Sequence, residues 1–188
     1  MSETASDDAQ LLDAWRGGDA RAGEQLVRRH ASRLRRFFAN KVDAGADDLC
    51  QQTWAACIEA RDRIEHDGAS RSFASYLFAA ARHRLINYYR QHQRQAQQFD
   101  PLVTSVAELG HGASANPSGA LAQHERRAKL HEALRSLPLD AQIALELHYW
   151  EHLSVREIGD ALGVPEGTIK ARLARARQQL HQRLHPQA

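Results

Sequence analysis

The sequence of 188 residues contains only two cysteines and five prolines. Cys50 and Cys57 lie seven residues apart within one helical pattern, and they are too few to staple a chain of this length. A disulfide-stabilised secreted scaffold is therefore excluded. We expect both cysteines to be reduced, as they are in the cytoplasm.

Long apolar runs are also missing, because the longest ones extend over only a few residues, whereas a helix needs about 20 apolar residues to span a bilayer. The first ten residues, MSETASDDAQ, are acidic, whereas a signal peptide begins with basic and then apolar residues. We therefore expect a cytoplasmic protein that is not inserted in a membrane. The sequence has no glycine-rich phosphate loop either, which disfavours kinases and other nucleotide-binding enzymes.

No stretch shows the two-residue alternation of a half-buried strand, and helical periodicity dominates, so we predict an all-α fold. Four helices are expected in the first half: about 8–17, about 19–41, one from about 46, and one after a polar loop at 66–72. The second helix has an apolar stripe formed by Leu26, His30, Leu34, Phe37 and Phe38. The stripe of the third is formed by Leu49, Cys50, Thr53, Trp54, Cys57 and Ile58.

The helical pattern fails from about residue 95 to residue 123, where glycine, proline and polar residues replace large apolar ones. A structureless segment of this length inside a compact domain would be unusual. We therefore predict two helical domains, at 8–94 and 124–184, joined by a flexible linker at 95–123.

The net charge of +2 hides blocks of opposite sign. Residues 28–41 carry six bases and no acid, and further basic blocks occupy 71–94 and 166–185. The segments 1–20 and 42–68 are acidic. Such blocks are often only solvated helix faces. Three basic blocks also suit a polyanion that binds at more than one place, with a separate partner for the acidic part.

The sharpest local pattern lies in the C-terminal half. Ser154 and Glu157 have the spacing of a capping box, so a helix is expected to begin at Val155. Gly163 suits a helix end because it takes a positive φ at little cost, and Pro165 is tolerated in the first turn of a following helix. Two short helices joined by a tight turn form a helix-turn-helix.

The second helix of this unit would enter the major groove of DNA, with its N-terminal part at the base edges and its cations at phosphates. A helical hairpin with a basic face is the alternative. Apolar residues upstream can supply the core of the unit: Leu130, Leu134, Leu137, Ile143, Leu145, Leu147, Trp150 and Leu153.

Several strings in this sequence resemble one known family. The segment from Leu153 to Arg177, which follows Leu137-Pro138, resembles the C-terminal part of the sigma factors of bacterial RNA polymerase, in particular the extracytoplasmic-function group. The string 46–54, ADDLCQQTW, is similar to the helix that docks on the polymerase in that family, and 72–83 is similar to the start of its promoter-melting element. Gln52 stands where the family usually has Glu, and Ala171 where many members have Ser.

The resemblance implies a non-catalytic protein, without cofactor or metal, that binds core RNA polymerase, promoter DNA and an anti-sigma factor. The residues implied in docking on the clamp helices of the largest polymerase subunit are Asp47, Asp48, Leu49, Gln51, Gln52, Thr53 and Trp54. The residues implied in binding the minus-ten element, both as duplex and as non-template single strand, are Ser70, Arg71, Ser72, Arg82, Asn87, Tyr88, Arg90 and Arg94. Those implied at the minus-thirty-five element are Glu166, Gly167, Thr168, Lys170, Ala171, Arg172, Arg175 and Arg177.

Two other functions compete with this one. A stand-alone helix-turn-helix regulator would bind its DNA site tightly without polymerase. A His-based metalloenzyme is suggested by His148 and His152, and by His181 and His185, since each pair has the four-residue spacing of metal ligands on a helix. However, no cysteine lies near these residues, and no Glu follows His148 as a metalloprotease helix requires.

Overall fold

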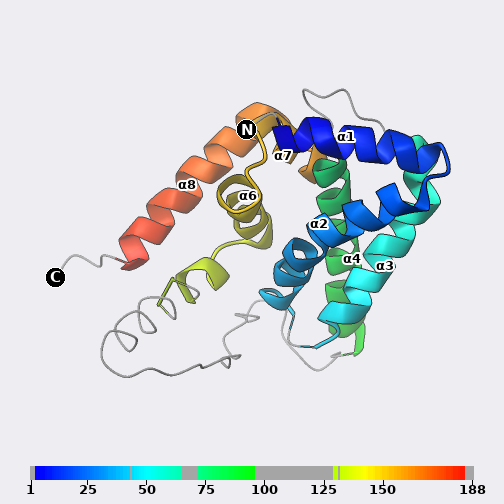
Figure 1. Ribbon diagram of the computed structural model, residues 1–188. Helices are drawn as coiled ribbons and strands as arrows, with labels where there is room; N and C mark the ends of the chain where they lie inside the picture. The colour runs from blue at the N-terminus through cyan, green and yellow to red at the C-terminus, as the bar shows by residue number, and fades with distance from the viewer. Residues whose placement is uncertain (1–2, 43, 65–71, 96–128, 131, 185–188) are drawn as a thin grey trace, which may run out of the picture.

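The structure is a computed structural model that describes residues 3–42, 44–64, 72–95, 129–130 and 132–184. Within these ranges all regular secondary structure is helical, as predicted (Figure 1). The elements are α1 (Glu3–Arg16), α2 (Ala20–Ala39), α3 (Ala46–Ala60), a 3-10 turn η1 (Arg61–Arg63), α4 (Phe73–Gln95), α6 (Leu139–Tyr149), α7 (Val155–Leu162) and α8 (Glu166–Leu184). Residues 132–135 are also helical. Nearly all of the predicted linker lies outside the described residues. None of the helices in the described ranges is long and apolar enough to cross a membrane.

Helices α1 to α4 pack together in the N-terminal half, and α2 contacts each of the other three. Asp19 caps α2, because its carboxylate accepts hydrogen bonds from the backbone N–H groups of Arg21 and Ala22 at 2.9 and 3.4 Å. The five residues of the predicted stripe of α2 are all buried, which confirms that prediction. A Cβ atom on Gly23 would lie 2.6 Å from Nε1 of Trp15, so glycine permits the close approach of α1 and α2.

The predicted stripe of α3 is only partly buried. Leu49, Thr53 and Cys57 are buried, whereas Ile58 is 51% exposed, so its prediction as a core residue was wrong. Ile58 follows Cys57 by one residue, which turns it about 100° away from the centre of the stripe.

The C-terminal half is built by α6, α7 and α8, which pack on one another. The capping box at Ser154 is present, and Gly163 ends α7 with a φ of 68°. Five of the eight predicted core residues are buried: Leu137, Ile143, Leu145, Leu147 and Leu153. Trp150 is 44% exposed, and its prediction as a core residue was wrong, because α6 ends at Tyr149 and Trp150 lies in the turn that follows.

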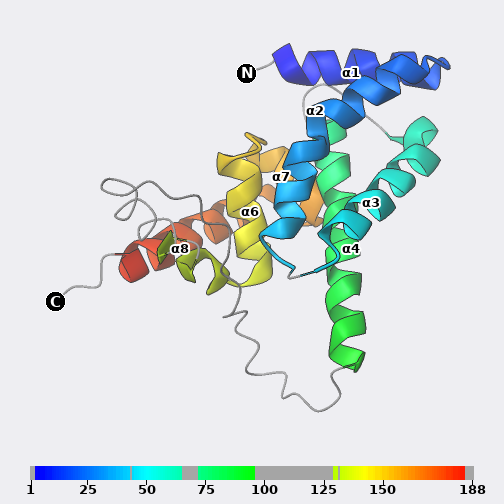
Figure 2. The ribbon, with the colours of Figure 1, turned by 60° about the horizontal axis from the view of Figure 1, so that its bottom comes forward.

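The two halves are in contact. Helix α4 packs against α7, and the buried apolar residues of both halves form one continuous cluster. Both views show α3 on the outer side of the N-terminal half, away from α6 and α8 (Figures 1 and 2). The outer side of α3 and the C-terminal half therefore face different sides of the molecule.

Candidate nucleic-acid interface

The turn between α7 and α8 is tight. The N–H of Val164 donates to the carbonyl of Gly159 at 3.0 Å, and a Cβ atom on Gly159 would lie 2.8 Å from the carbonyl oxygen of Val164. Ile158 of α7 and Ile169 of α8 are fully buried. These contacts fix the angle between the two helices and leave the other side of α8 to solvent.

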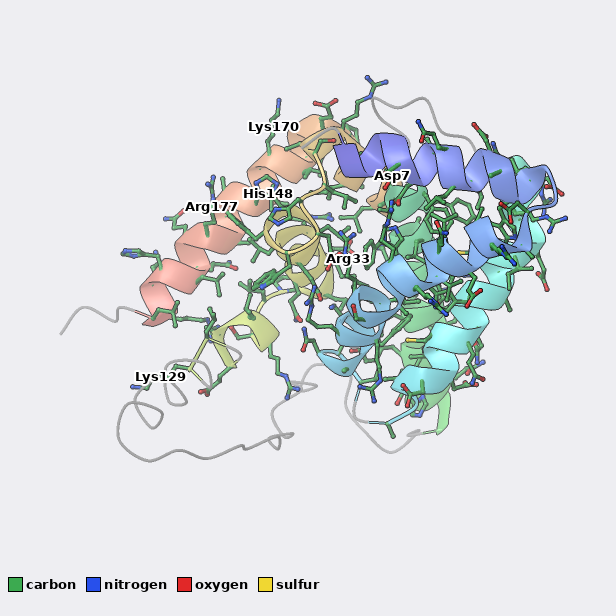
Figure 3. The ribbon with its side chains drawn as sticks, viewed as in Figure 1. Asp7, Arg33, Lys129, His148, Lys170 and Arg177 are labelled. Atoms are coloured by element: carbon green, nitrogen blue, oxygen red, sulfur yellow. The ribbon has the colours of Figure 1, made fainter. Side chains whose placement is uncertain are left out.

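Most of the residues implied at the minus-thirty-five element lie on that solvent side. Seven of the eight are exposed: Glu166, Gly167, Thr168, Lys170, Ala171, Arg175 and Arg177. Lys170 and Arg177 point away from α6 (Figure 3). The ammonium of Lys170 lies 4.0 Å from the carboxylate of Glu166, at the limit of an ion pair. The face therefore presents cations at the positions where a recognition helix would meet DNA.

Arg172, the eighth residue of this set, is turned inward. Its side chain is 22% exposed, and Nη1 lies 3.4 Å from Oδ2 of Asp140, at the start of α6. The same carboxylate accepts hydrogen bonds from Nε and Nη2 of Arg82 on α4, at 3.1 and 3.0 Å. One arginine from each implied DNA-binding set thus contacts the carboxylate of Asp140.

Only some of the residues implied at the minus-ten element lie in the part of the chain that the structure describes. Ser70 and Arg71 lie outside the described residues, as does the side chain of Arg94. Ser72 lies at the start of α4, where its Oγ accepts a hydrogen bond from the N–H of Ser75 at 3.2 Å. This bond satisfies an N–H group at the helix end and fixes where the helix begins.

Further along α4, Asn87 and Tyr88 are half-buried and Arg90 is exposed. The hydroxyl of Tyr88 donates to the carbonyl of Ala44 at 3.2 Å, and its ring lies 3.9 Å from that of His92. The hydrogen bond ties α4 to the loop before α3, so the tyrosine has a structural role in this arrangement.

The residues of α3 that the resemblance implies in polymerase docking differ in how far they are buried. Asp47, Asp48, Gln51 and Gln52 are exposed, Trp54 is half-buried, and Leu49 and Thr53 are buried. Thr53 donates from Oγ1 to the carbonyl of Leu49 at 2.7 Å. Leu49 and Thr53 therefore position the helix, and side-chain contact with a partner is left to the exposed residues.

The basic block at 28–41 faces acids of the same chain, because each of its six bases forms an ion pair within the protein. The pairs are Arg28 with Glu24, Arg29 with Asp7 and Asp8, Arg33 and Arg36 with Glu151, Arg35 with Asp47, and Lys41 with Glu146. In this arrangement the charge of the block is partly balanced by acids of the same chain. Glu146 and Glu151 gave no sequence signal except that they interrupt apolar stretches.

The cysteines and His148 show no sign of a metal site or of a reactive thiol in the part of the chain that the structure describes. Burial raises the pKa of Cys57 to about 12, and burial together with the charge of Asp47 raises the pKa of Cys50 to about 11, so both thiols are protonated at neutral pH. Nδ1 of His148 lies 3.4 Å from the carbonyl oxygen of Leu153. Among the described residues, no three His, Cys, Asp or Glu side chains are placed to hold a metal ion together.

The helix-turn-helix, with its exposed cationic second helix, defines a DNA-binding protein with a second helical part attached. The family model described as sigma-70 region 2 matches residues 24–95, and the one described as sigma-70, region 4 matches residues 127–180. Together they cover more than half of the chain, which belongs to the sigma-70 family of RNA polymerase sigma factors. It is a sigma factor of the extracytoplasmic-function type, which directs transcription initiation.

Curated relatives match over nearly the whole length. The RNA polymerase sigma-H factor of Pseudomonas aeruginosa is 28% identical over 190 residues, covering 97% of this chain and 96% of that protein. The ECF RNA polymerase sigma-E factor of Escherichia coli K12 is 26% identical over 191 residues, covering 99% of this chain and 98% of that protein. The similarity therefore includes both halves and the segment between them.

Two solved structures have a similar fold. CnrH, solved in complex with the cytosolic domain of CnrY, superposes with a TM-score of 0.66 at 22% identity, covering 97% of this chain and 99% of that chain. The sigma factor RpoE of Bartonella quintana, solved with the anti-sigma factor NepR, gives a TM-score of 0.64 at 22% identity, covering 88% and 98%. At this level of identity the likeness concerns the fold.

Proposed function

We propose that α8 of this sigma factor binds duplex DNA at the minus-thirty-five element. The observation that carries the proposal is the exposure of Lys170, Arg175 and Arg177 on the second helix of a helix-turn-helix. Residues near the start of that helix, such as Thr168, would meet base edges, and the cations further along would meet phosphates. Arg172 would join them once it leaves Asp140.

Core RNA polymerase docks on α3 through Asp47, Asp48, Gln51 and Gln52, the exposed members of the implied set, and its clamp helices are the partner surface. Two features support this assignment. The four side chains are exposed, and their helix, α3, lies on the side of the N-terminal half away from α6 and α8 (Figure 2). Trp54, half-buried beside Phe73, would form the edge of the docking surface.

The minus-ten element is captured by α4 and the segment before it, including Ser70, Arg71 and Ser72. Flipping a base out of the duplex costs a few kcal/mol, which stacking and contacts with arginine must recover. Asn87, Tyr88, Arg90 and Arg94 on α4 would lie nearer the duplex or the backbone.

The protein works as two domains, 8–94 and 124–184, joined by the segment 95–123. It acts in the cytoplasm without catalysis of its own, and an anti-sigma factor regulates it. CnrH and the Bartonella sigma factor, the neighbours in fold, were each solved with a protein partner, and the second partner is an anti-sigma factor. This supports a regulatory partner of the same kind for this chain.

The test of the DNA-binding face is the triple variant Lys170→Ala, Arg175→Ala and Arg177→Ala. Bound to core polymerase, it should bind a promoter more weakly than the wild type, and the slope of log affinity against log salt should flatten by about 1 for each phosphate that is no longer neutralised. Arg21→Ala, Arg28→Ala and Arg63→Ala, which remove three exposed cations elsewhere, serve as the matched control. Equal binding by the two triple variants would reject the assignment of α8.

A stand-alone regulator is the competing function. A gel shift of a promoter fragment with and without core polymerase separates the two. The sigma factor should bind specifically only when core polymerase is added, whereas a stand-alone regulator would bind as tightly without it.

A further inference from the structure

The last residue of α1 is an arginine that is hydrogen-bonded through every nitrogen of its guanidinium. Nε of Arg16 donates to the carbonyl of Arg61 at 3.0 Å, and Nη2 donates to the carbonyl of Ile64. Nη1 donates to Oδ1 of Asp13, one turn earlier on α1, at 2.9 Å. Both views place the end of α3 beside the end of α1 (Figures 1 and 2). Arg16 therefore joins the end of α1 to the backbone at and just after η1.

The two carbonyls lie where a helix ends, and such carbonyls need a donor from elsewhere. The last four carbonyls of an α-helix have no partner within the helix, and α3 ends at Ala60. The three residues of η1 form a single 3-10 turn, whose hydrogen bonds have poorer geometry than those of an α-helix. A cation is also favourable at the negative end of a helix dipole. The guanidinium of Arg16 thus supplies both the hydrogen bonds and the charge that this helix end requires.

Arg16 itself is held in place by the packing of α1. Leu12 and Trp15 are buried, and the indole of Trp15 packs so closely on α2 that only glycine fits at position 23. Asp13 orients the guanidinium from the previous turn, and the Arg16 side chain is only 26% exposed. Ile64, on the other side of the contact, is 1% exposed. The contact therefore connects two well-packed parts of the N-terminal half.

A second set of side-chain hydrogen bonds holds the backbone at the start of α4. The N–H of Ser72 donates to Oγ of Ser75 at 3.1 Å, and the N–H of Ser75 donates to Oγ of Ser72 at 3.2 Å. Oγ of Ser75 also donates to the carbonyl of Ser72 at 2.8 Å. Ile64 and Ser72 are the described residues on either side of the segment 65–71. The backbone on both sides of that segment is therefore fixed by side chains, by Arg16 on one side and by the two serines on the other.

We propose that Arg16 is a positioning residue for the capture of the minus-ten element. It holds the backbone at Ile64 while the serine bonds hold it at Ser72, so the residues between them meet DNA with both ends of their segment in place. A segment whose ends are fixed loses less conformational entropy when it binds. The inference rests on the proposed roles of Ser70, Arg71 and Ser72. Arg16 acts without touching DNA, because each of its guanidinium nitrogens is bonded within the protein.

The test compares Arg16→Met with Arg61→Ala in the full-length chain bound to core polymerase. Methionine keeps an unbranched apolar stem and removes the donors. Arg61→Ala is the matched control, because it removes a cation at the same place but leaves the main-chain carbonyl that Arg16 binds. The probe is a labelled non-template strand that covers the minus-ten element of the promoter fragment used to test α8. Arg16→Met should bind it about tenfold more weakly than the control, roughly the cost of ordering one further residue on binding.

Two further measurements separate positioning from a general loss of structure. Arg16→Met should keep the helical content of the wild type in circular dichroism, and it should bind core polymerase and a minus-thirty-five duplex as the control does. Equal weakening of all three interactions would mean that Arg16 only stabilises the fold, and the positioning role would be wrong. Binding of the minus-ten strand equal to that of Arg61→Ala would also reject it.

Arg16→Lys separates the shape of the guanidinium from its charge. Lysine keeps the positive charge but lacks the planar fork that bonds two carbonyls and Asp13 at once. Its affinity for the minus-ten strand should therefore stay below that of the wild type. An affinity equal to that of the wild type would show that charge alone acts at this position, against the proposal.

Arg71→Ala tests the proposed function separately. Unchanged binding of the minus-ten strand by this variant would reject the proposed role of Arg71 in capturing that element. Weakened binding by Arg71→Ala together with normal binding by Arg16→Met would leave the proposed function intact and reject only the positioning role of Arg16. The two failures can therefore be distinguished.

Discussion

Asp8 shows how one residue connects the first helix to the rest of the molecule. Its carboxylate is 5% exposed; Oδ2 lies 2.7 Å from Nε2 of the buried His30, and Oδ1 accepts from Nη1 of Arg29 at 2.5 Å. Burial acts to raise the pKa of Asp8, but the hydrogen bonds and charges of His30 and Arg29 outweigh it, so the pKa is lowered. The ionised carboxylate therefore stabilises the folded state.

The variant Asp8→Asn should lower the free energy of unfolding at pH 7 by about 2 kcal/mol, the size of a hydrogen bond to a charged group. A lowered folded-state pKa means that this stability is present above the usual value of 3.8 and is lost as pH falls through the folded pKa. The difference in free energy of unfolding between wild type and variant, measured with urea, should therefore shrink as pH falls below about 5, until the folded protein is itself protonated at Asp8.

Asp7→Asn is the control for this measurement. Asp7 is 55% exposed and pairs only at the surface with Arg29, so its loss should cost well under about 1 kcal/mol. If the difference in free energy of unfolding between wild type and Asp8→Asn stays constant down to about pH 3, the Asp8 carboxylate is not the source of the stability.

At the scale of elements, local signals determine where the helices begin and end. Ser154 accepts a hydrogen bond from the N–H of Glu157 at 3.2 Å, and the Glu157 carboxylate accepts one from the N–H of Ser154 at 2.8 Å. These bonds satisfy two N–H groups at the start of α7, which would otherwise need water. The helix is only eight residues long, so its cap is a large share of its own stability.

Replacing Ser154 by Ala should therefore lower the free energy of unfolding by about 1 kcal/mol, and Thr at this position should retain most of it. Ser32→Ala serves as the control, because Ser32 is exposed in the middle of α2, where alanine is the better helix former. Thermal unfolding followed by circular dichroism compares the three variants. A loss for Ser32→Ala equal to that for Ser154→Ala would exclude the cap as the cause.

The helices and the helix-turn-helix could be predicted because their signals lie within a few residues of one another. Ile58 and Trp150 were misassigned because periodicity does not show where a stripe ends or where a helix stops short. The exposed cations of α8 followed from the motif. The inward turn of Arg172 did not, because its partner Asp140 lies 32 residues earlier in the sequence and no local pattern connects them.

At the scale of the whole molecule, the net charge of +2 is the difference between 25 bases and 23 acids, some of which form ion pairs with one another. Bases of the N-terminal half are neutralised by acids of the C-terminal half, across 105 to 118 residues of sequence for Lys41 and Arg33. Composition records both sets of charges but contains no information on their pairing. Pairing across such separations depends on the tertiary arrangement.

Salt should open the wild-type chain. Raising ionic strength from about 0.1 M to about 1 M shortens the Debye length from about 10 Å to about 3 Å. This weakens the ion pairs between the two halves that are partly open to solvent, such as Arg36, which is 48% exposed, with Glu151, and Arg82, which is 25% exposed, with Asp140. The radius of gyration measured by scattering should rise with sodium chloride in the wild type and stay constant in the Asp140→Asn, Glu146→Gln, Glu151→Gln variant. A wild type that is insensitive to salt would mean that apolar packing of α4 on α7 holds the halves together by itself.

The charge-matched contact also limits how freely the halves can be exchanged between related proteins. Asp140, Glu146 and Glu151 of the C-terminal half pair with bases of the N-terminal half. A hybrid that kept the N-terminal half and took its C-terminal half from a relative without acids at these three positions would leave Lys41 buried without an anion. The two halves are therefore bound to change together, each substitution at the contact in one half restricting which residues the other can accept.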